Sequence, residues 1–179
     1  IQDQILAQGE VLSAKLVVFL LNQKGISAKL ADTRELIITD SNFGDAQPLD
    51  TISKKNIIQI FKENKDSVLV ITGFIGSNAK NETTTLGRNG SNYTASLIAN
   101  YINAEELQNF THVDGIYTAN PELVLDAKKI ESLSYSEANE MANFGANILH
   151  AKTIIPLLDK NMALWILNTF NYKNNGTLI

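Results

Sequence analysis

The 179-residue chain contains no cysteine, and it has only two histidines, three prolines and one tryptophan. The absence of cysteine excludes disulfides, thiolate metal sites and a cysteine nucleophile. Because His112 and His150 are the two histidines, a histidine-rich metal centre is excluded as well. The sequence therefore excludes proteins that are held together by cross-links or by a Cys/His zinc site.

An excess of positive charge is also lacking, since 15 Lys and Arg stand against 19 Asp and Glu and give a formal net charge of -4. Proteins that bind nucleic acid present a basic face to the phosphates, so this balance argues against such a partner. The longest apolar run, residues 16–21, is too short to cross a membrane. The chain does not begin with Met, so we expect the natural N-terminus to lie upstream.

Apolar residues at helical spacing alternate along the chain with short β-branched runs, and this order predicts an α/β class. The run from Val68 to Thr72 predicts a strand buried on both faces. The polar stretch that follows, residues 77–84, predicts a mobile loop, and Ser91 is expected to be a helix N-cap. The predicted helices are 4–21, 51–62, 91–102, 134–141 and 151–158, and the predicted strands are 26–30, 36–39, 68–72, 106–111, 163–167 and 176–179.

The stretch "GRNGSNYT", residues 87–94, places two glycines and an arginine before a predicted helix. Such a turn presents free backbone N–H groups and the positive end of the helix dipole to an anion. Arg88 adds a planar donor fork suited to a carboxylate or phosphate. The spacing matches neither common phosphate-loop pattern, so a polar loop that merely caps a helix is an equally good interpretation.

Three further stretches carry chemistry-bearing residues and also allow plain structural interpretations. In "HVDGIYTANPELV", Tyr117 is suited to stack on a base or ribose, or to pack in a tight turn. "MANFGANILHAKTI" taken alone indicates a connector between two helices, and Glu10 in "QGEVLSAKL" indicates a solvated acid near the start of a helix.

Taken in order, six stretches resemble the aspartokinase family, and together they cover nearly the whole chain. They are "QGEVLSAKL", "VLVITGFIGS", "TTTLGRNGSNYTASLIA", "HVDGIYTANPELV", "LSYSEANEMANFGANILHAKTI" and "NTFNYKNNGTLI". The resemblance implies an α/β fold, a three-layer α/β/α sandwich with a mainly parallel sheet, present here incompletely. It implies that residues 1–179 are the later part of a kinase domain, with no second domain in this chain. Some family members continue into regulatory ACT domains and a homoserine dehydrogenase.

The resemblance further implies ATP-dependent phosphorylation of the side-chain carboxylate of L-aspartate to 4-phospho-L-aspartate. This reaction is the first step of lysine, threonine and methionine biosynthesis. The implied cofactors are ATP and Mg²⁺, and the implied partners are L-aspartate and ATP, with no nucleic acid and no membrane. A cytoplasmic location and a homo-oligomeric full-length protein are implied as well. The 179-residue chain alone is expected to be inactive, because the family's phosphate-binding lysine would lie upstream of it.

On the aspartate side, the resemblance assigns substrate binding to Glu10, Phe74, Arg88 and Ser91. Arg88 and Asn92 stand at the catalytic positions, where Asn92 replaces a family acid. An amino acid needs a carboxylate for its ammonium group and a cation for its carboxylates, so Glu10 and Arg88 fit this role chemically.

On the nucleotide side, the resemblance assigns Thr111, His112, Gly115, Tyr117, Glu122 and Asn147, and it assigns no metal ligand. Four of these positions or their neighbours depart from the family pattern: His112 and Asn120 replace acids, Glu122 replaces an arginine and Asn147 replaces a lysine. These changes leave two alternatives open. One is an aspartokinase-like amino-acid-binding or regulatory domain with weak or no kinase activity, and the other is a related kinase acting on another substrate.

Overall fold

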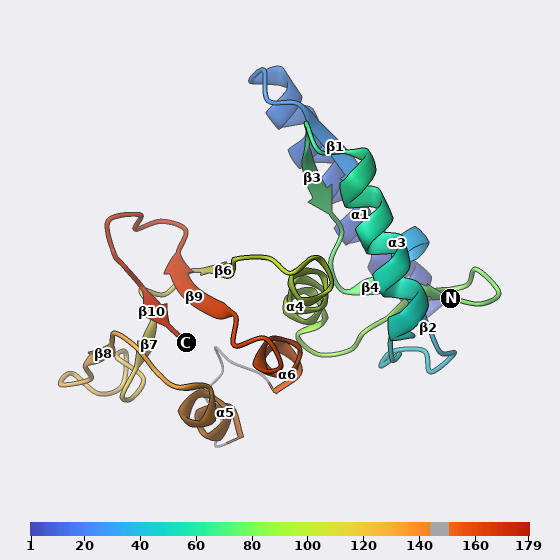
Figure 1. Ribbon diagram of the computed structural model, residues 1–179. Helices are drawn as coiled ribbons and strands as arrows, with labels where there is room; N and C mark the ends of the chain where they lie inside the picture. The colour runs from blue at the N-terminus through green and yellow to red at the C-terminus, as the bar shows by residue number, and fades with distance from the viewer. Residues whose placement is uncertain (144–150) are drawn as a thin grey trace. The chain divides into compact units, whose positions relative to one another are not determined.

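The computed structural model describes residues 1–143 and 151–179, and it divides the chain into two compact units, residues 1–102 and 103–179 (Figure 1). Helices and strands alternate in both units, and parallel strand pairs occur in each. The α/β class predicted from the sequence is therefore confirmed.

The strands of the first unit form a two-stranded sheet and a three-stranded sheet. In the first sheet β1 (Ala28–Ala31) runs parallel to β3 (Val68–Ile71). In the second, β2 (Ile38–Thr39) runs parallel to β4 (Ile75–Asn78), which pairs antiparallel with β5 (Thr83–Thr85). The short segment between β3 and β4 thus passes from one sheet to the other, and it carries Phe74.

Four helices belong to the first unit: α1 (Gln2–Gln23), α2 (Thr33–Leu36), α3 (Asp50–Glu63) and α4 (Gly90–Ile102). The main core lies where α3 and α4 meet beside β1 and includes Ile57, Leu97 and Tyr101. The Tyr101 hydroxyl donates to Asp50 Oδ1 at 2.5 Å, so the core aromatic also ties α4 to the start of α3. Burial, together with this bond, raises the pKa of Tyr101 well above its usual range.

The second unit pairs β6 (Glu106–Thr111) parallel with β9 (Ala163–Asn168), and β9 antiparallel with β10 (Thr177–Leu178). A two-stranded ribbon joins β7 (Ile116–Tyr117) to β8 (Lys129–Ile130). The helices are α5 (Tyr135–Asn143) and α6 (Ala151–Leu158). Ser134 and Glu137 form a capping box at the start of α5, because Glu137 Oε2 accepts from Ser134 N and Oγ while Ser134 Oγ accepts from Glu137 N.

Several local expectations are corrected by the structure. Residues 77–84 form most of the β4–β5 hairpin instead of a mobile loop, and Leu36 ends the short helix α2 instead of opening a strand. Ser91 is not an N-cap, because α4 begins one residue earlier, at Gly90. The β3 strand is not buried on both faces: Val68 is 49% exposed, and the other three residues of the strand are only half-buried.

Helix α1 is confirmed, but its small residues face inward. Ala7 and Val11 pack with Ile75 and the partly buried Phe74, whereas Leu12 and Leu16 are 64% and 59% exposed.

By length and composition alone, α1 could cross a membrane, with a mean hydropathy of 1.5 over its most apolar window. A single helix near the N-terminus is weak support for a membrane span, because core helices and signal sequences pass the same test. The expected absence of a membrane span therefore stays a prediction.

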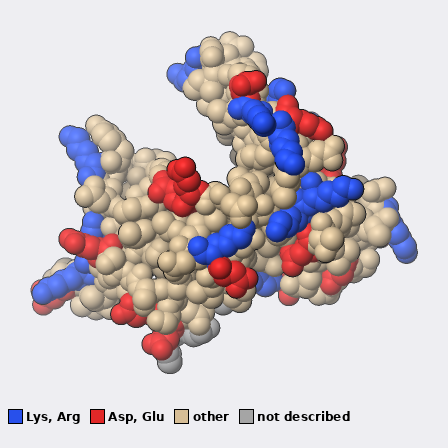
Figure 2. Space-filling model, in the orientation of Figure 1, with Lys and Arg blue, Asp and Glu red and all other residues tan. Residues whose placement is uncertain are grey.

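Charged side chains are scattered over the visible surface. On the face shown in Figure 2, Lys and Arg are interspersed with Asp and Glu, and large areas carry no charge. This face therefore lacks the continuous basic patch that a phosphate backbone requires.

The core position of Ile57 gives a direct test of the packing in the first unit. Ile57 is fully buried in the α3–α4 core, whereas Ile52 on the same helix is 44% exposed. We expect Ile57→Ala to lower the free energy of unfolding by about 2–5 kcal/mol, because it removes buried methyl groups and leaves a cavity. Ile52→Ala, the matched control, should cost well under half as much. Urea denaturation measures both values, and equal losses would contradict the assigned core.

Candidate functional site

A pocket of about 390 Å³ in the first unit gathers the residues predicted for the amino-acid side of the site. Glu10 enters it from α1, Phe74 from the segment between β3 and β4, and Arg88 from the loop between β5 and α4. Ser91 and Asn92 line it from the first turn of α4. Segments that are up to 82 residues apart in the sequence thus meet at one small concave surface. The volume of this pocket falls within the range of pockets that bind small ligands.

Phe74 forms the wall of this pocket in an unusual backbone conformation. Its φ is 69°, and Ile75 N donates to Gly73 O at 2.8 Å across it, which makes a γ-turn of the rare positive-φ kind. Two further bonds hold the turn: Phe74 N donates to Thr94 Oγ1 at 3.1 Å, and Leu86 N donates to Phe74 O at 2.8 Å. Strain of this kind persists where surrounding bonds fix it, and such places are often binding sites.

Two glycines allow this turn to approach the start of α4. A Cβ on Gly73 would lie 2.9 Å from Ser91 Cβ, and a Cβ on Gly90 would lie 2.7 Å from Phe74 Cδ2. Both distances are shorter than real carbon contacts, so any side chain here would push the two segments apart. The close approach brings Phe74 and Ser91 into the same pocket.

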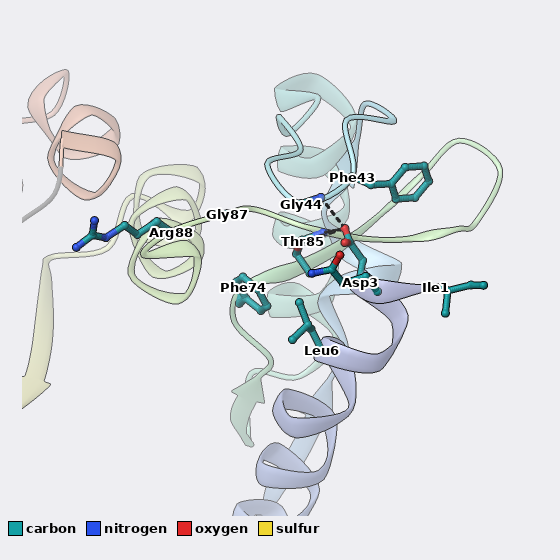
Figure 3. Close-up of a pocket in the computed structure, with 10 residues that line it drawn as sticks. Ile1, Asp3, Leu6, Phe43, Gly44, Phe74, Thr85, Gly87 and Arg88 are labelled. Carbon is teal, nitrogen blue, oxygen red and sulfur yellow. Dashed lines mark hydrogen bonds between the residues drawn. The ribbon is translucent and has the colours of Figure 1, made fainter.

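The electrostatics of the pocket combine groups of opposite sign. Glu10 is half-buried, and Ser91 Oγ lies 3.5 Å from Glu10 Oε1. Arg88 is exposed and extends away from Asp3 and Phe43 (Figure 3). The first turn of α4 adds the positive end of a helix dipole. A carboxylate, a guanidinium and a helix N-terminus around a small pocket are complementary to a small zwitterion with an extra carboxylate.

In the second unit, the structure brings together four of the residues predicted to meet the nucleotide: Thr111, His112, Gly115 and Tyr117. Thr111 ends β6, the buried Gly115 precedes β7, and the half-buried Tyr117 ends β7. The exposed His112 offers its carbonyl oxygen to Asn168 Nδ2 at 3.4 Å. These residues form one loop beside the carboxyl ends of β6 and β9, the edge where α/β sheets usually bind ligands.

Two predicted nucleotide residues are not joined to this loop. Glu122 lies on an exposed turn, where its backbone N–H donates to Asn120 Oδ1 at 2.9 Å. No hydrogen bond or ion pair in the described part of the chain links the Glu122 side chain to the other four. Asn147 lies outside the described residues. Within residues 1–143 and 151–179, no group of three or more His, Asp or Glu side chains is placed to hold a metal ion.

Sequence reasoning missed the residues that hold the second-unit loop in place. Asp114 Oδ1 accepts from Asn168 Nδ2 at 2.7 Å and from Asn171 Nδ2 at 3.1 Å. Thr177 Oγ1 accepts from Ile116 N at 2.9 Å and donates to Ile130 O at 2.5 Å. The bonded partners lie 47 to 61 residues apart in the sequence, so no local pattern predicts these bonds. The one available signal was an Asp-Gly turn in a chain whose last residues are rich in asparagine.

Comparison of the chain with known proteins identifies its family. A family model described as "Amino acid kinase family" matches residues 1–168. The chain belongs to the amino acid kinase family. The expected family resemblance is therefore confirmed.

Within the amino acid kinase family, the chain is similar to aspartokinases. It is 35% identical to the lysine-sensitive aspartokinase 3 of Escherichia coli over 99% of its own length and 40% of that protein. It is 36% identical to the chloroplastic bifunctional aspartokinase/homoserine dehydrogenase 2 of Arabidopsis thaliana, over 99% of its own length and 19% of that protein. The chain therefore spans well under half the length of these relatives.

A solved structure agrees with the sequence comparison. The crystal structure of E. coli aspartokinase III in complex with aspartate and ADP superposes with a TM-score of 0.94 at 35% identity. The match covers 98% of this chain and 40% of that one.

The tight turn at Asp114 and Gly115 can be tested by its effect on the stability of the protein. Gly115 has a φ of 133°, and a Cβ there would lie 2.6 Å from Thr177 Oγ1. We expect Gly115→Ala to lower the free energy of unfolding by about 1–3 kcal/mol through backbone strain. Gly9→Ala is the matched control, because Gly9 lies inside α1 with no neighbour within 4 Å of the added Cβ. Thermal unfolding that shows no difference between the two variants would refute the tight turn.

Proposed function

We propose that the protein containing this chain is an aspartate kinase, which transfers the γ-phosphoryl group of ATP to the side-chain carboxylate of L-aspartate. The observation that carries the proposal is the pocket that joins Glu10, Phe74, Arg88 and Ser91 in one unit. The similarity to aspartokinases supports it, including a relative solved with aspartate and ADP. The product would be 4-phospho-L-aspartate, and the reaction would open the synthesis of lysine, threonine and methionine.

In this proposal, the first unit binds the amino acid. Glu10 accepts hydrogen bonds from the ammonium group, and the Arg88 guanidinium pairs with a carboxylate through two parallel bonds. Phe74 closes the apolar side of the pocket, and Ser91 Oγ adds a donor beside Glu10. With the ammonium and a carboxylate held, the side-chain carboxylate oxygen is oriented to attack phosphorus while ADP departs. Catalysis then rests mainly on positioning and on charge stabilisation.

The second unit holds the nucleotide in this proposal. Tyr117 supplies an aromatic face for the base or ribose, and the Thr111–Gly115 loop leads into it. The described residues do not form a magnesium site of their own, since they contain no acidic cluster. We therefore assign Mg²⁺ to the phosphates of ATP, which commonly bring the ion with them. Asn92 would position a phosphate oxygen by hydrogen bonding, without the charge of an acid.

A cytoplasmic location and a homo-oligomeric full-length protein are further parts of the proposal, carried by the family resemblance. A second candidate function is amino-acid binding with little or no phosphoryl transfer. The specific observation in its favour is Asn92, a neutral amide lining the amino-acid pocket at a position where the family has an acid.

The two functions are separated by assaying the full-length protein with ATP, Mg²⁺ and L-aspartate in the presence of hydroxylamine. An acyl phosphate is trapped as a hydroxamate, so an aspartate kinase gives a signal that depends on both substrates. We expect such turnover. Aspartate binding by calorimetry without hydroxamate above background would favour the binding domain and overturn the kinase proposal.

The role of Arg88 is tested by Arg88→Ala in the full-length protein, with Arg34→Ala as the matched control. Arg34 lies on α2, where it pairs with Asp32 at 2.5 Å and does not line the pocket. We expect Arg88→Ala to raise the Kd for aspartate by at least about tenfold, the change that corresponds to 1.4 kcal/mol. Arg34→Ala should leave this Kd unchanged. A Kd for Arg88→Ala within about threefold of wild type would show that Arg88 does not pair with the substrate.

A further inference from the structure

Asp3 is a buried carboxylate that lies outside the amino-acid pocket and has no role in the function proposed so far. It stands in the first turn of α1 and is 5% exposed. Its Oδ2 atom accepts three hydrogen bonds: from Gly44 N at 2.9 Å, from Thr85 N at 2.8 Å and from Thr85 Oγ1 at 3.1 Å (Figure 3). The donors belong to two segments that are 41 and 82 residues away in the sequence.

A buried carboxylate is costly unless hydrogen bonds replace its hydration. The three donors provide that replacement. The bonds therefore hold the first turn of α1 against the end of β5 and the loop before Ala46. Ala46 N in turn donates to Thr85 O at 2.9 Å, which closes the junction.

The two elements that meet at Asp3 also carry the two charged groups of the amino-acid pocket. Asp3 and Glu10 are seven residues apart, about two helical turns, so they lie on the same side of α1. Thr85 ends β5, and Gly87 and Arg88 follow after a single residue, Leu86. A neighbouring pocket of about 580 Å³ is lined by Asp3, Phe74 and Arg88 together, so the junction borders the site without entering the smaller pocket.

We propose that Asp3 is a positioning residue that sets the separation of Glu10 from Arg88 and thereby the affinity for the amino acid. It acts through α1 on one side and through β5 on the other, and it does not touch the substrate. The inference rests on the proposed function, because it assumes that Glu10 and Arg88 hold the two ends of one amino acid. It predicts a selective effect: the junction controls the amino-acid half of the reaction and leaves the nucleotide half unaffected.

The test compares Asp3→Ala with Asp3→Asn in the full-length protein. The alanine removes the acceptor, whereas the amide oxygen of asparagine keeps an acceptor for the same donors. We expect Asp3→Ala to raise both the KM and the Kd for aspartate about tenfold and to change the KM for ATP less than about twofold. Asp3→Asn should restore the aspartate values to within about threefold of wild type.

Ile57→Ala is the stability control, because it weakens the core of the same unit at a residue that does not line the pocket. It should lower the melting temperature without moving either KM, so a selective rise in the aspartate KM separates positioning from general destabilisation. If Asp3→Ala does not fold, Thr85→Val serves in its place, since it removes the hydroxyl donor alone. That variant should raise the aspartate Kd by about threefold at unchanged ATP KM.

Calorimetry on the wild-type protein keeps the two proposals distinguishable. If the wild type binds aspartate and the folded Asp3 or Thr85 variants bind it equally well, the positioning role is overturned and the proposed function stands. Equal rises in the KM for both substrates would also overturn the positioning role. If the wild type binds no aspartate, the proposed function fails and the role of Asp3 fails with it.

Discussion

The close contact between the Gly73–Phe74 turn and the first turn of α4 is the constraint on which the first unit depends. The turn is possible because Gly73 and Gly90 lack side chains, and it is held by the Thr94 hydroxyl, which accepts from Phe74 N and donates to Gly90 O at 3.0 Å. The chain passes at this point from one sheet to the other, so the same contact fixes the two sheets relative to α4. A strained Phe74 is tolerated because several bonds to its neighbours determine its conformation.

Much of the fold could be predicted from local patterns. The periodicity that predicted α3 and the apolar run that predicted β9 are each contained within one element. The errors arise where burial depends on what lies alongside. The residues of β3 are those of a central strand, yet the described structure gives it one partner, and four of the five leucines of α1 are exposed while its alanines pack inward. No periodicity within a single element specifies its neighbours.

The site was predictable to a different degree in each unit. Glu10, Phe74, Arg88 and Ser91 were named from a family resemblance, and the structure gathers all four in one pocket, which spacing alone would not have predicted. Asp3, Asp114 and Thr177 were missed, because each bonds to backbone groups or amides dozens of residues away. An acid or hydroxyl that stabilises a junction through such distant partners has no local signature in the sequence.

The division into two units bears on how the departures from the family pattern are interpreted. Among the positions that depart from the family pattern, Asn92 lines the amino-acid pocket, whereas His112, Asn120 and Glu122 lie in the second unit. The Glu10 and Arg88 pair that would recognise an amino acid is therefore intact.

The five departures that the resemblance implies balance in charge when they are taken together. In the correspondence that the family resemblance implies, neutral residues stand for acids at positions 92, 112 and 120 and for a lysine at 147, and Glu122 stands for an arginine. The formal charge of the five positions taken together is consequently unchanged. Phosphoryl transfer depends on the electrostatic environment of the phosphates as a whole. The exchange is spread over both units, since Asn92 lines the amino-acid pocket whereas His112 and Asn120 lie in the second unit, so it redistributes charge without changing the sum.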